Sequence, residues 1–503
     1  MFLSEIKAVA FFSLMLYDLP MRARIFTIWL IFFILGSMVA PLFETAPTIY
    51  LYIGLVLVAG SFLIYGRRYF FGVAFAFGLL LLTISLFQYR EATLIHKNEV
   101  ISAHKVTIVG SVSGIPTVNE FGQTVIINVN SINNINEKAK LKVYAPTYPN
   151  FKQGQMLSFE AAVKPYGDKK WRLAKDGYVG EANLGDYTLM GTETGLLAEV
   201  KSWLFAIRAS FNNAISRSLP AAESGLGSGL ILGEKALITP EVTRQLQISG
   251  TTHIIALSGY NITIILGLFV FLRGKLSRLA NIIVPLVFIL AFVVMTGGAA
   301  SLVRAAIMGF MPLIGSYLGR ESDSFIAILF SAAVMIVFNP FLALFDVGFQ
   351  LSFTALAGMI YLAPIISKLL GNLPEYISGP LAETTGAQLA AMPLLAYYFG
   401  SVSLISPIAN LLILSLVPLG MLTAFAIGIS GIIWQGFANF VAIPGYVVLH
   451  AINSLVAFFG SLPAASKSIK VENPVWILFV YFFIFDVWLI LSKRTWIKAN
   501  DNL

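Results

Sequence analysis

The sequence predicts a polytopic α-helical membrane protein into which a small all-β domain is inserted. Of its 503 residues, 57% are hydrophobic and 12% are charged, and the mean hydropathy is +0.82, which is far more apolar than a globular domain requires. Apolar runs long enough to cross about 30 Å of hydrocarbon recur on both sides of one long hydrophilic stretch. We therefore expect about twelve transmembrane spans and an inserted, extracytoplasmic, OB-like β domain.

The N-terminal segment, residues 1–90, carries three of these apolar runs, near 25–43, 48–65 and 69–88. Paired arginines precede the first run and separate the second from the third, which places the N-terminus in the cytoplasm under the positive-inside rule. The residues before the first run have the mixed character of an interfacial helix, and no small-residue cleavage site follows that run. We expect the hydrophilic stretch that comes next to lie outside the membrane.

That hydrophilic stretch, residues 91–195, changes to the period of two that is typical of β-strands. It holds eleven Lys and Arg against eleven Asp and Glu between Glu91 and Val200, so the net charge of +8 comes from short loops elsewhere. We expect about five strands in a partly open barrel, a fold that often binds single strands. A cluster of cations and aromatic residues fits either such a binding surface or a solvated hairpin: Lys164, Tyr166, Lys169, Lys170, Trp171, Arg172 and Lys175.

Residues 196–250 are predicted to form amphipathic helices, because apolar side chains recur there at helical spacing with polar groups opposite. The pattern is typical of a helix on the membrane surface and equally of one packed against the barrel. A polytopic domain at 251–492 and a short cytoplasmic tail at 493–503 follow, and the basic loops place both termini in the cytoplasm. Breaks by Gly or Pro near 296–305 and 371–383 also fit re-entrant segments, which would reverse the later spans.

Ionisable groups inside the apolar runs mark the candidate site of the polytopic domain. A charge at such depth costs about 2.5–3.5 kcal/mol even on a lenient scale, so it faces a partner or a water-filled cavity. Asp346, Gln350 and Thr354 recur at i, i+4 and i+8 on one helix face, and Arg304 follows a stretch of small residues. These side chains either line a hydrated passage or, for Arg304 and Asp346, form a structural ion pair between two spans.

A second polar group stands at the head of an apolar run and includes His253 and Ser258. An intramembrane serine protease is one alternative, but residues five apart on a helix point about 140° apart, so the dyad would need His450 from a distant span. An ion-coupled small-solute transporter is another alternative, with a broken helix at 249–259 and the Asp346 stripe forming its binding site.

Four motifs in order resemble the ComEC family of competence proteins: GLILGEKALITPEVTRQLQISGTTHIIALSGYNI, GGAASLVRAAIM, NPFLALFDVGFQLSFTALAGMIYLAP and GAQLAAMPLLAYYFG. The resemblance implies a conduit that takes single-stranded DNA across the bacterial cytoplasmic membrane in natural transformation. One departure is Tyr260 followed by Asn261, where many members have an apolar residue followed by His. The candidate translocation residues are Gly233, Glu234, His253, Ser258, Gly259, Asn261, Arg304, Asp346, Gln350 and Ser352.

The sequence offers no recognisable motif for cutting a strand or hydrolysing a nucleotide. It has no cysteine, its four histidines are widely spread, and it lacks a GxxxxGK[ST] loop, so we expect no metal, no cofactor and no enzymatic activity. Many ComEC members append a metallo-β-lactamase-like domain, whereas this sequence stops soon after its last predicted span. The expected partners are single-stranded DNA, membrane lipid, a DNA receptor, a separate nuclease, and a cytoplasmic ATPase or single-strand-binding protein.

Overall fold

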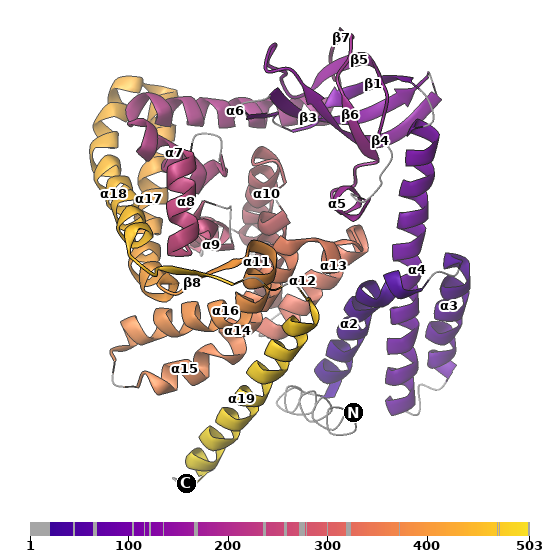
Figure 1. Cartoon of the computed structure of the whole chain (residues 1–503), viewed down its shortest axis with the longest axis vertical. Helices are drawn as coiled ribbons and strands as arrows, with labels where there is room; N and C mark the ends of the chain where they lie inside the picture. Colours follow the sequence, from indigo (N-terminus) through magenta and orange to yellow (C-terminus); the bar gives the residue numbers. More distant parts are fainter. Residues whose placement is uncertain are drawn as a thin grey trace.

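A β domain and a set of helices, joined by one long helix and one crossing helix, make up the chain in this computed structural model (Figure 1). The structure describes residues 21–500 except for 44–45, 64–67, 103–104, 115, 120–121, 134, 165–169, 235–237, 256–258, 271–276, 278, 299, 318–322, 372, 470 and 472. The first residues, predicted as an interfacial helix, lie outside this range.

In the described part of the N-terminal segment the α-helices are α2 (Met21–Val39), α3 (Pro47–Leu63) and α4 (Arg68–Ser102). Helix α4 continues well past residue 88, where we expected its apolar run to end, and carries the chain without a break up to the β domain (Figure 1). Its polar second half contains several good helix formers, which favours this continuation. At its far end the buried Asn98 side chain donates a hydrogen bond of 2.6 Å to the Val179 carbonyl, which holds the helix against the β domain.

The β domain is one sheet of seven strands within the described residues, compared with the five or so expected. They are β1 (Val106–Val112), β2 (Thr117–Asn119), β3 (Gly122–Ile132), β4 (Ile135–Ala145), β5 (Gln155–Ala161), β6 (Gly180–Asn183) and β7 (Tyr187–Thr192). The order is β6-β4-β3-β1-β5-β7, with β2 beside β3, and only β4 and β6 are parallel. Alternating residues fill its core, including Ile108, Ile127, Leu141 and Phe159.

Three helices connect the β domain to the remaining helices: α6 (Leu196–Ser218), α7 (Ala221–Leu232) and α8 (Pro240–Ser249). Helix α6 crosses the top of the helices in Figure 1 and buries Leu204, Arg208, Phe211 and Ile215, which recur on one face. The predicted amphipathic helix is therefore present. Its first turns leave Leu196 and Trp203 exposed.

The rest of the chain is almost entirely helical. It comprises η3 (Thr252–Ile254), α9 (Gly259–Val270), α10 (Ala280–Met295), α11 (Ala300–Tyr317), α12 (Ser324–Phe338), α13 (Leu342–Phe345), α14 (Val347–Tyr361), α15 (Ala363–Leu369), α16 (Glu375–Phe399), α17 (Ser406–Ile433), α18 (Gln435–Ser461) and α19 (Val475–Asn500). Two short strands, β8 (Ser401–Ser403) and β9 (Ser466–Ser468), pair to join the start of α17 to the segment after α18.

Several of these helices are apolar, as the sequence predicts. In the described part of the chain, four helices are long and apolar enough to cross a membrane: Ala23–Leu42, Phe70–Ser102, Ser406–Ile433 and Gln435–Ser461. Helices α14 and α15 pass the same test only together, bent by 45° at their junction, and five further apolar helices are shorter. The largely helical chain with apolar helices and a small sheet region is thus confirmed, and the number of spans stays a prediction.

Candidate functional site

Arg304 lies near the start of α11 and is almost completely buried, with 4% of its surface exposed. Its Nη2 atom donates a 2.5 Å hydrogen bond to Oγ of Ser352 on α14. No described residue accepts a hydrogen bond from its Nη1 atom. Gly259, the first residue of α9, lies against Ala305, because a Cβ atom added to it would be 3.5 Å from Ala305 Cβ. The structure therefore brings together three predicted site residues from three helices.

Asp346 occupies the break between α13 and α14 and is the N-cap of α14. Its Oδ1 atom accepts a 2.5 Å hydrogen bond from the Phe349 backbone N–H, and its Oδ2 atom lies 3.5 Å from Lys175 Nζ. Within the described residues, Asp346 forms its ion pair with Lys175 and not with Arg304. The interpretation that Arg304 and Asp346 lock two spans as a pair thus has no direct contact to support it.

Gln350 uses its whole side-chain amide within the protein. Its Nε2 atom donates to the carbonyls of Ala343 (3.1 Å) and Leu344 (2.7 Å) in α13, and its Oε1 atom accepts from the Tyr398 hydroxyl (2.8 Å) on α16. Thr354 Oγ1 in turn donates to the Gln350 carbonyl at 2.7 Å. Gln350 and Thr354 thus lie on α14 and Asp346 is its N-cap, and Gln350 connects the broken helix to α16. That these side chains line a hydrated passage stays a prediction.

The β domain meets this site through α5 (Lys170–Ala174), a short helix within the cluster that the sequence left as either a binding surface or a solvated hairpin. The Trp171 ring stacks on Phe345 with centroids 4.4 Å apart and planes 4° apart, and it also contacts Phe87 and Phe341. Lys170 forms an ion pair with Glu91 of α4. Beyond the helix, the Lys175 carbonyl accepts a 2.5 Å hydrogen bond from the Asn339 side chain.

Three residues predicted to bind DNA therefore hold the β domain on the helices: Lys170, Trp171 and Lys175. Lys164 has an exposed side chain, whereas Tyr166, Lys169 and the Arg172 side chain lie outside the described part of the structure. Sequence reasoning missed the other side of this interface, Phe345 and Asn339. The only signal in the sequence was an aromatic residue and an amide residue near the candidate charge of Asp346, and that signal is weak.

Glu234 and Gly233 belong to a second site at the end of α7. Gly233 ends the helix in the left-handed conformation, with φ of 67°, which favours glycine. The Glu234 Oε2 atom lies 2.8 Å from Nη2 of Arg208 on α6, and Arg208 Nη1 donates to the Met295 carbonyl at 3.2 Å. Sequence reasoning missed Arg208, although it stands on the buried face of α6 at helical spacing between Leu204 and Phe211.

The residues around the start of α9 are only partly described. Asn261 is buried and donates a 2.8 Å hydrogen bond to the Leu230 carbonyl of α7. His253 is exposed and its imidazole hydrogen-bonds the Gly250 backbone. Ser258 lies outside the described residues, so the dyad with His450 stays untested. The Nδ1 atom of His450 lies 2.9 Å from the buried Glu223 carboxylate.

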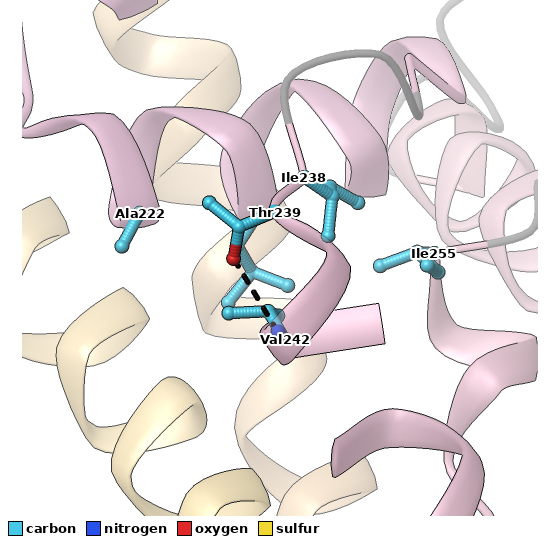
Figure 2. Close-up of a pocket in the computed structure, with 6 residues that line it drawn as sticks. Ala222, Ile238, Thr239, Val242 and Ile255 are labelled. Carbon is cyan, nitrogen blue, oxygen red and sulfur yellow. Dashed lines mark hydrogen bonds between the residues drawn. The ribbon is translucent and has the colours of Figure 1, made fainter. Parts of the chain in front are cut away.

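A small pocket lies where α7 and α8 meet, with Ile255 also in its lining (Figure 2). Its lining is apolar except for Thr239, whose Oγ1 atom caps α8 by accepting a 3.3 Å hydrogen bond from Val242 N. It offers no charged group to a ligand. Among the residues that the structure describes, no group of three or more His, Asp or Glu side chains gathers as a metal site.

A buried arginine beside a helix break, set among apolar helices, defines a helical protein with a polar site inside its apolar part. The family described as "Competence protein" matches residues 230–496, more than half of the chain. The chain belongs to this competence protein family, which confirms the resemblance seen in the sequence. Arg304, Ser352, Asp346 and Glu234 all lie in the matched region, whereas the β domain and α6 precede it.

Two relatives align with about half of the chain. The chain is 32% identical over 255 residues to ComE operon protein 3 of Bacillus subtilis (strain 168), an alignment that covers 50% of the chain and 29% of the relative. It is 26% identical over 261 residues to Competence protein ComA of Neisseria gonorrhoeae, covering 47% of the chain and 36% of the relative. The alignments thus span about a third of each relative's length. No solved structure matches the chain.

Proposed function

We propose that this protein is a transmembrane conduit for the uptake of single-stranded DNA across the cytoplasmic membrane in natural transformation. The observation that carries the proposal is the buried Arg304, held by Ser352 beside the helix break at Asp346, in the region that matches the competence family. A buried cation among apolar helices is costly and marks a pathway or site for a polar substrate. A strand of DNA carries one negative charge per nucleotide, which suits a cationic passage.

The backbone around this site supports a hydrated passage. Helices α13 and α14 break at Asp346, and α14 and α15 meet at a 45° bend. Irregular backbone at membrane depth is tolerated where it is buried in protein or lines a water-filled cavity. Gly348, where an added Cβ atom would lie 4.0 Å from Arg304 Nη2, is exposed, and so is Gly259, which lies against Ala305. An exposed backbone position therefore lies beside the Arg304 guanidinium.

We infer that the β domain is OB-like and faces the outside, with both termini in the cytoplasm. Its pairing supports this fold, because β1 lies between β3 and β5, β4 follows β3, and the consecutive strands β6 and β7 pair with the two ends of that array. Because Lys170, Trp171 and Lys175 contact the helices, the β domain would bind a DNA strand through another surface.

The proposed uptake also assigns roles to partners. A DNA receptor would deliver the duplex, a separate nuclease would degrade one strand, and a cytoplasmic ATPase or single-strand-binding protein would draw in the other. Membrane lipid would surround the apolar helices.

In the β domain, the Glu181 carboxylate accepts hydrogen bonds from Tyr144 at 3.0 Å and from Lys142 at 3.4 Å, so this carboxylate stabilises the sheet.

An ion-coupled small-solute transporter is the second candidate, because a broken helix with a carboxylate at the break resembles the binding sites of that class. The two functions differ in their ligand. Purified protein that binds labelled single-stranded DNA, with no competition from small solutes, supports the conduit. Solute uptake into proteoliposomes that depends on Asp346 supports the transporter.

The conduit is tested by measuring transformation in a competent host whose own conduit gene is replaced by this one. We expect Arg304→Leu to lower transformation by at least a hundredfold, because the passage loses its buried cation. The matched control is Lys467→Gln, which removes an exposed cation on β9 and should leave transformation unchanged. Membrane levels of each variant are compared by immunoblot. Normal transformation by Arg304→Leu at a normal level would remove Arg304 from the passage.

A further inference from the structure

The charge of Arg304 is unbalanced in its immediate surroundings. Only 4% of the residue is exposed, yet no described carboxylate forms an ion pair with it. Asp346, the carboxylate whose charge acts on it most, is engaged by Lys175 and by the Phe349 N–H. A buried cation without a counter-charge is strongly destabilising. We expect a protein to retain such a group where an anion binds to it and balances its charge.

The unused donors of this site point to one kind of anion. Arg304 Nη1 is buried without an acceptor in the described part of the chain, and the Ser352 hydroxyl, which accepts from Nη2, keeps its own hydrogen for donation. A planar guanidinium and an adjacent hydroxyl match the oxygens of a phosphate group. The site therefore offers donors from two neighbouring helices, α11 and α14, to one oxyanion.

Glycine provides the access to this site. Gly348 is exposed, and a Cβ atom added to it would lie 3.2 Å from Asp346 Oδ1 and 4.0 Å from Arg304 Nη2. The absence of a side chain at position 348 thus leaves open a space that both the guanidinium and the carboxylate border. An incoming oxyanion would meet Arg304 across that space without displacing a side chain of residue 348.

We propose that Arg304 and Ser352 form a binding site for one phosphate oxyanion, reached past Gly348. The proposal rests on the proposed function where the phosphate belongs to the DNA strand, and a phospholipid headgroup is the other source of the same chemistry. Arg304 and Lys175 carry two positive charges against one on Asp346, so the local surplus is small. Conduction requires a site that binds weakly enough to release its ligand, and this balance suits that requirement.

Binding of a phosphate that belongs to a DNA strand is tested by fluorescence anisotropy of a labelled oligothymidylate with the purified full-length chain at several salt concentrations. We expect Arg304→Gln to reduce the slope of log Kd against log salt by about 0.7, the value for one phosphate contact on a single strand. Arg304→Lys keeps the charge and should keep the slope. Lys467→Gln is the control for loss of an exposed cation. A methylphosphonate oligothymidylate, with an uncharged backbone, should bind wild type and Arg304→Gln equally.

Binding of a phosphate that belongs to a lipid headgroup is tested by thermal unfolding in detergent with added phosphatidylglycerol or with a galactolipid that lacks phosphate. Stabilisation by phosphatidylglycerol alone that disappears in Arg304→Gln would assign the site to a headgroup, with the phosphate site still supported. If wild type binds no oligothymidylate while this lipid effect persists, the conduit loses its support and the phosphate site does not. If Arg304→Gln changes neither the salt slope nor the lipid effect, the site is overturned.

Ser352→Ala keeps the test decisive where Arg304→Gln does not fold. It removes one hydroxyl and leaves the charge of Arg304 in place. Because a hydrogen bond to a charged group is lost, we expect the Kd for oligothymidylate, or for the stabilising phospholipid, to rise on the order of tenfold. An unchanged Kd for both ligands with a folded Ser352→Ala protein would contradict the site.

Discussion

The Nζ atom of Lys175 lies 3.5 Å from Oδ2 of Asp346, so the β domain is tied to the N-cap of α14. The sequence suggested different tasks for the two residues: Lys175 fitted a DNA-binding surface or a solvated hairpin of the β domain, and Asp346 fitted a membrane passage or an ion pair with Arg304. Their side chains are 22% and 15% exposed, so the pair is largely shielded from solvent. The contact joins the β domain to the helix break beside the candidate site.

Asp346 has two separable roles in this arrangement, a helix cap and an ion pair. Asp346→Asn keeps an oxygen for the Phe349 N–H, whereas Asp346→Leu removes cap and charge together. We expect Asp346→Leu to be less stable than Asp346→Asn by about 0.5–2 kcal/mol, the usual worth of an N-cap. Thermal unfolding of the purified protein in detergent measures this difference. Equal stability of the two variants would show that the cap contributes nothing.

The ion pair is measured by a double-mutant cycle with Lys175→Met and Asp346→Asn. We expect a coupling energy of about 0.5–3 kcal/mol, because each single change leaves the other charge without its partner. The same cycle with Arg304→Leu in place of Lys175→Met should show a smaller coupling, since Arg304 has no direct contact with Asp346. A larger coupling to Arg304 would contradict the assignment of the pair to Lys175.

The polar stripe on α14 shows what could and could not be predicted from the sequence. The spacing of Asp346, Gln350 and Thr354 predicted one helix face, and the structure has Gln350 and Thr354 on α14 with Asp346 at its N-cap. It could not show that the helix starts at Val347, because a single Asp serves as readily inside a polar stripe as at an N-cap. Nor could it show that Gln350 binds α13 and Tyr398, since those contacts depend on how α16 packs.

The same limit applies to the β domain and to α6. Period-two alternation identified the strands, but the stacking of Trp171 on Phe345 joins residues far apart in the chain, and no local pattern encodes it. An exposed basic cluster and a docking helix have the same composition. Arg208 differs, because a cation on the apolar face of an amphipathic helix is visible in the sequence and predicts a buried partner, here Glu234.

Trp171 is expected to stabilise the docking of the β domain. Trp171→Ala should lower the stability by about 3 kcal/mol, because the ring packs among Phe87, Phe341 and Phe345. Trp171→Phe keeps an aromatic ring and should lose much less. Thermal unfolding of the three proteins gives the comparison. If Trp171→Ala weakens binding of single-stranded DNA and leaves the stability unchanged, Trp171 belongs to a binding surface instead.

The ion pair of Arg208 and Glu234 is expected to hold α6 onto the helices, because Arg208 also bonds the end of α10. The two side chains are 9% and 20% exposed, so removing one leaves a poorly hydrated charge. Glu234→Gln should therefore destabilise the protein by about 3 kcal/mol, and the double variant Arg208→Met, Glu234→Gln should recover part of that loss. Lys201→Gln, an exposed cation on the same helix, is the matched control. Additive losses in the double variant would show that the pair is not coupled.

Ionisation of Tyr178 is expected to lower the stability of the β domain at alkaline pH. Burial raises the pKa of its hydroxyl to about 12, and the nearby charge of Asp176 adds to this effect. The pKa of tyrosine in an unfolded chain is about 10, so the folded state favours the neutral phenol. This contribution is complete below about pH 10 and is lost as the pH rises from about 10 through about 12.

Tyr178→Phe, which cannot ionise, should remain folded to higher pH than wild type, measured by circular dichroism of the β domain during an alkaline titration. Tyr148→Phe is the control, since Tyr148 is 79% exposed and its removal should leave the titration unchanged. A wild-type protein and a Tyr178→Phe variant that unfold at the same pH would show that ionisation of Tyr178 does not limit the domain.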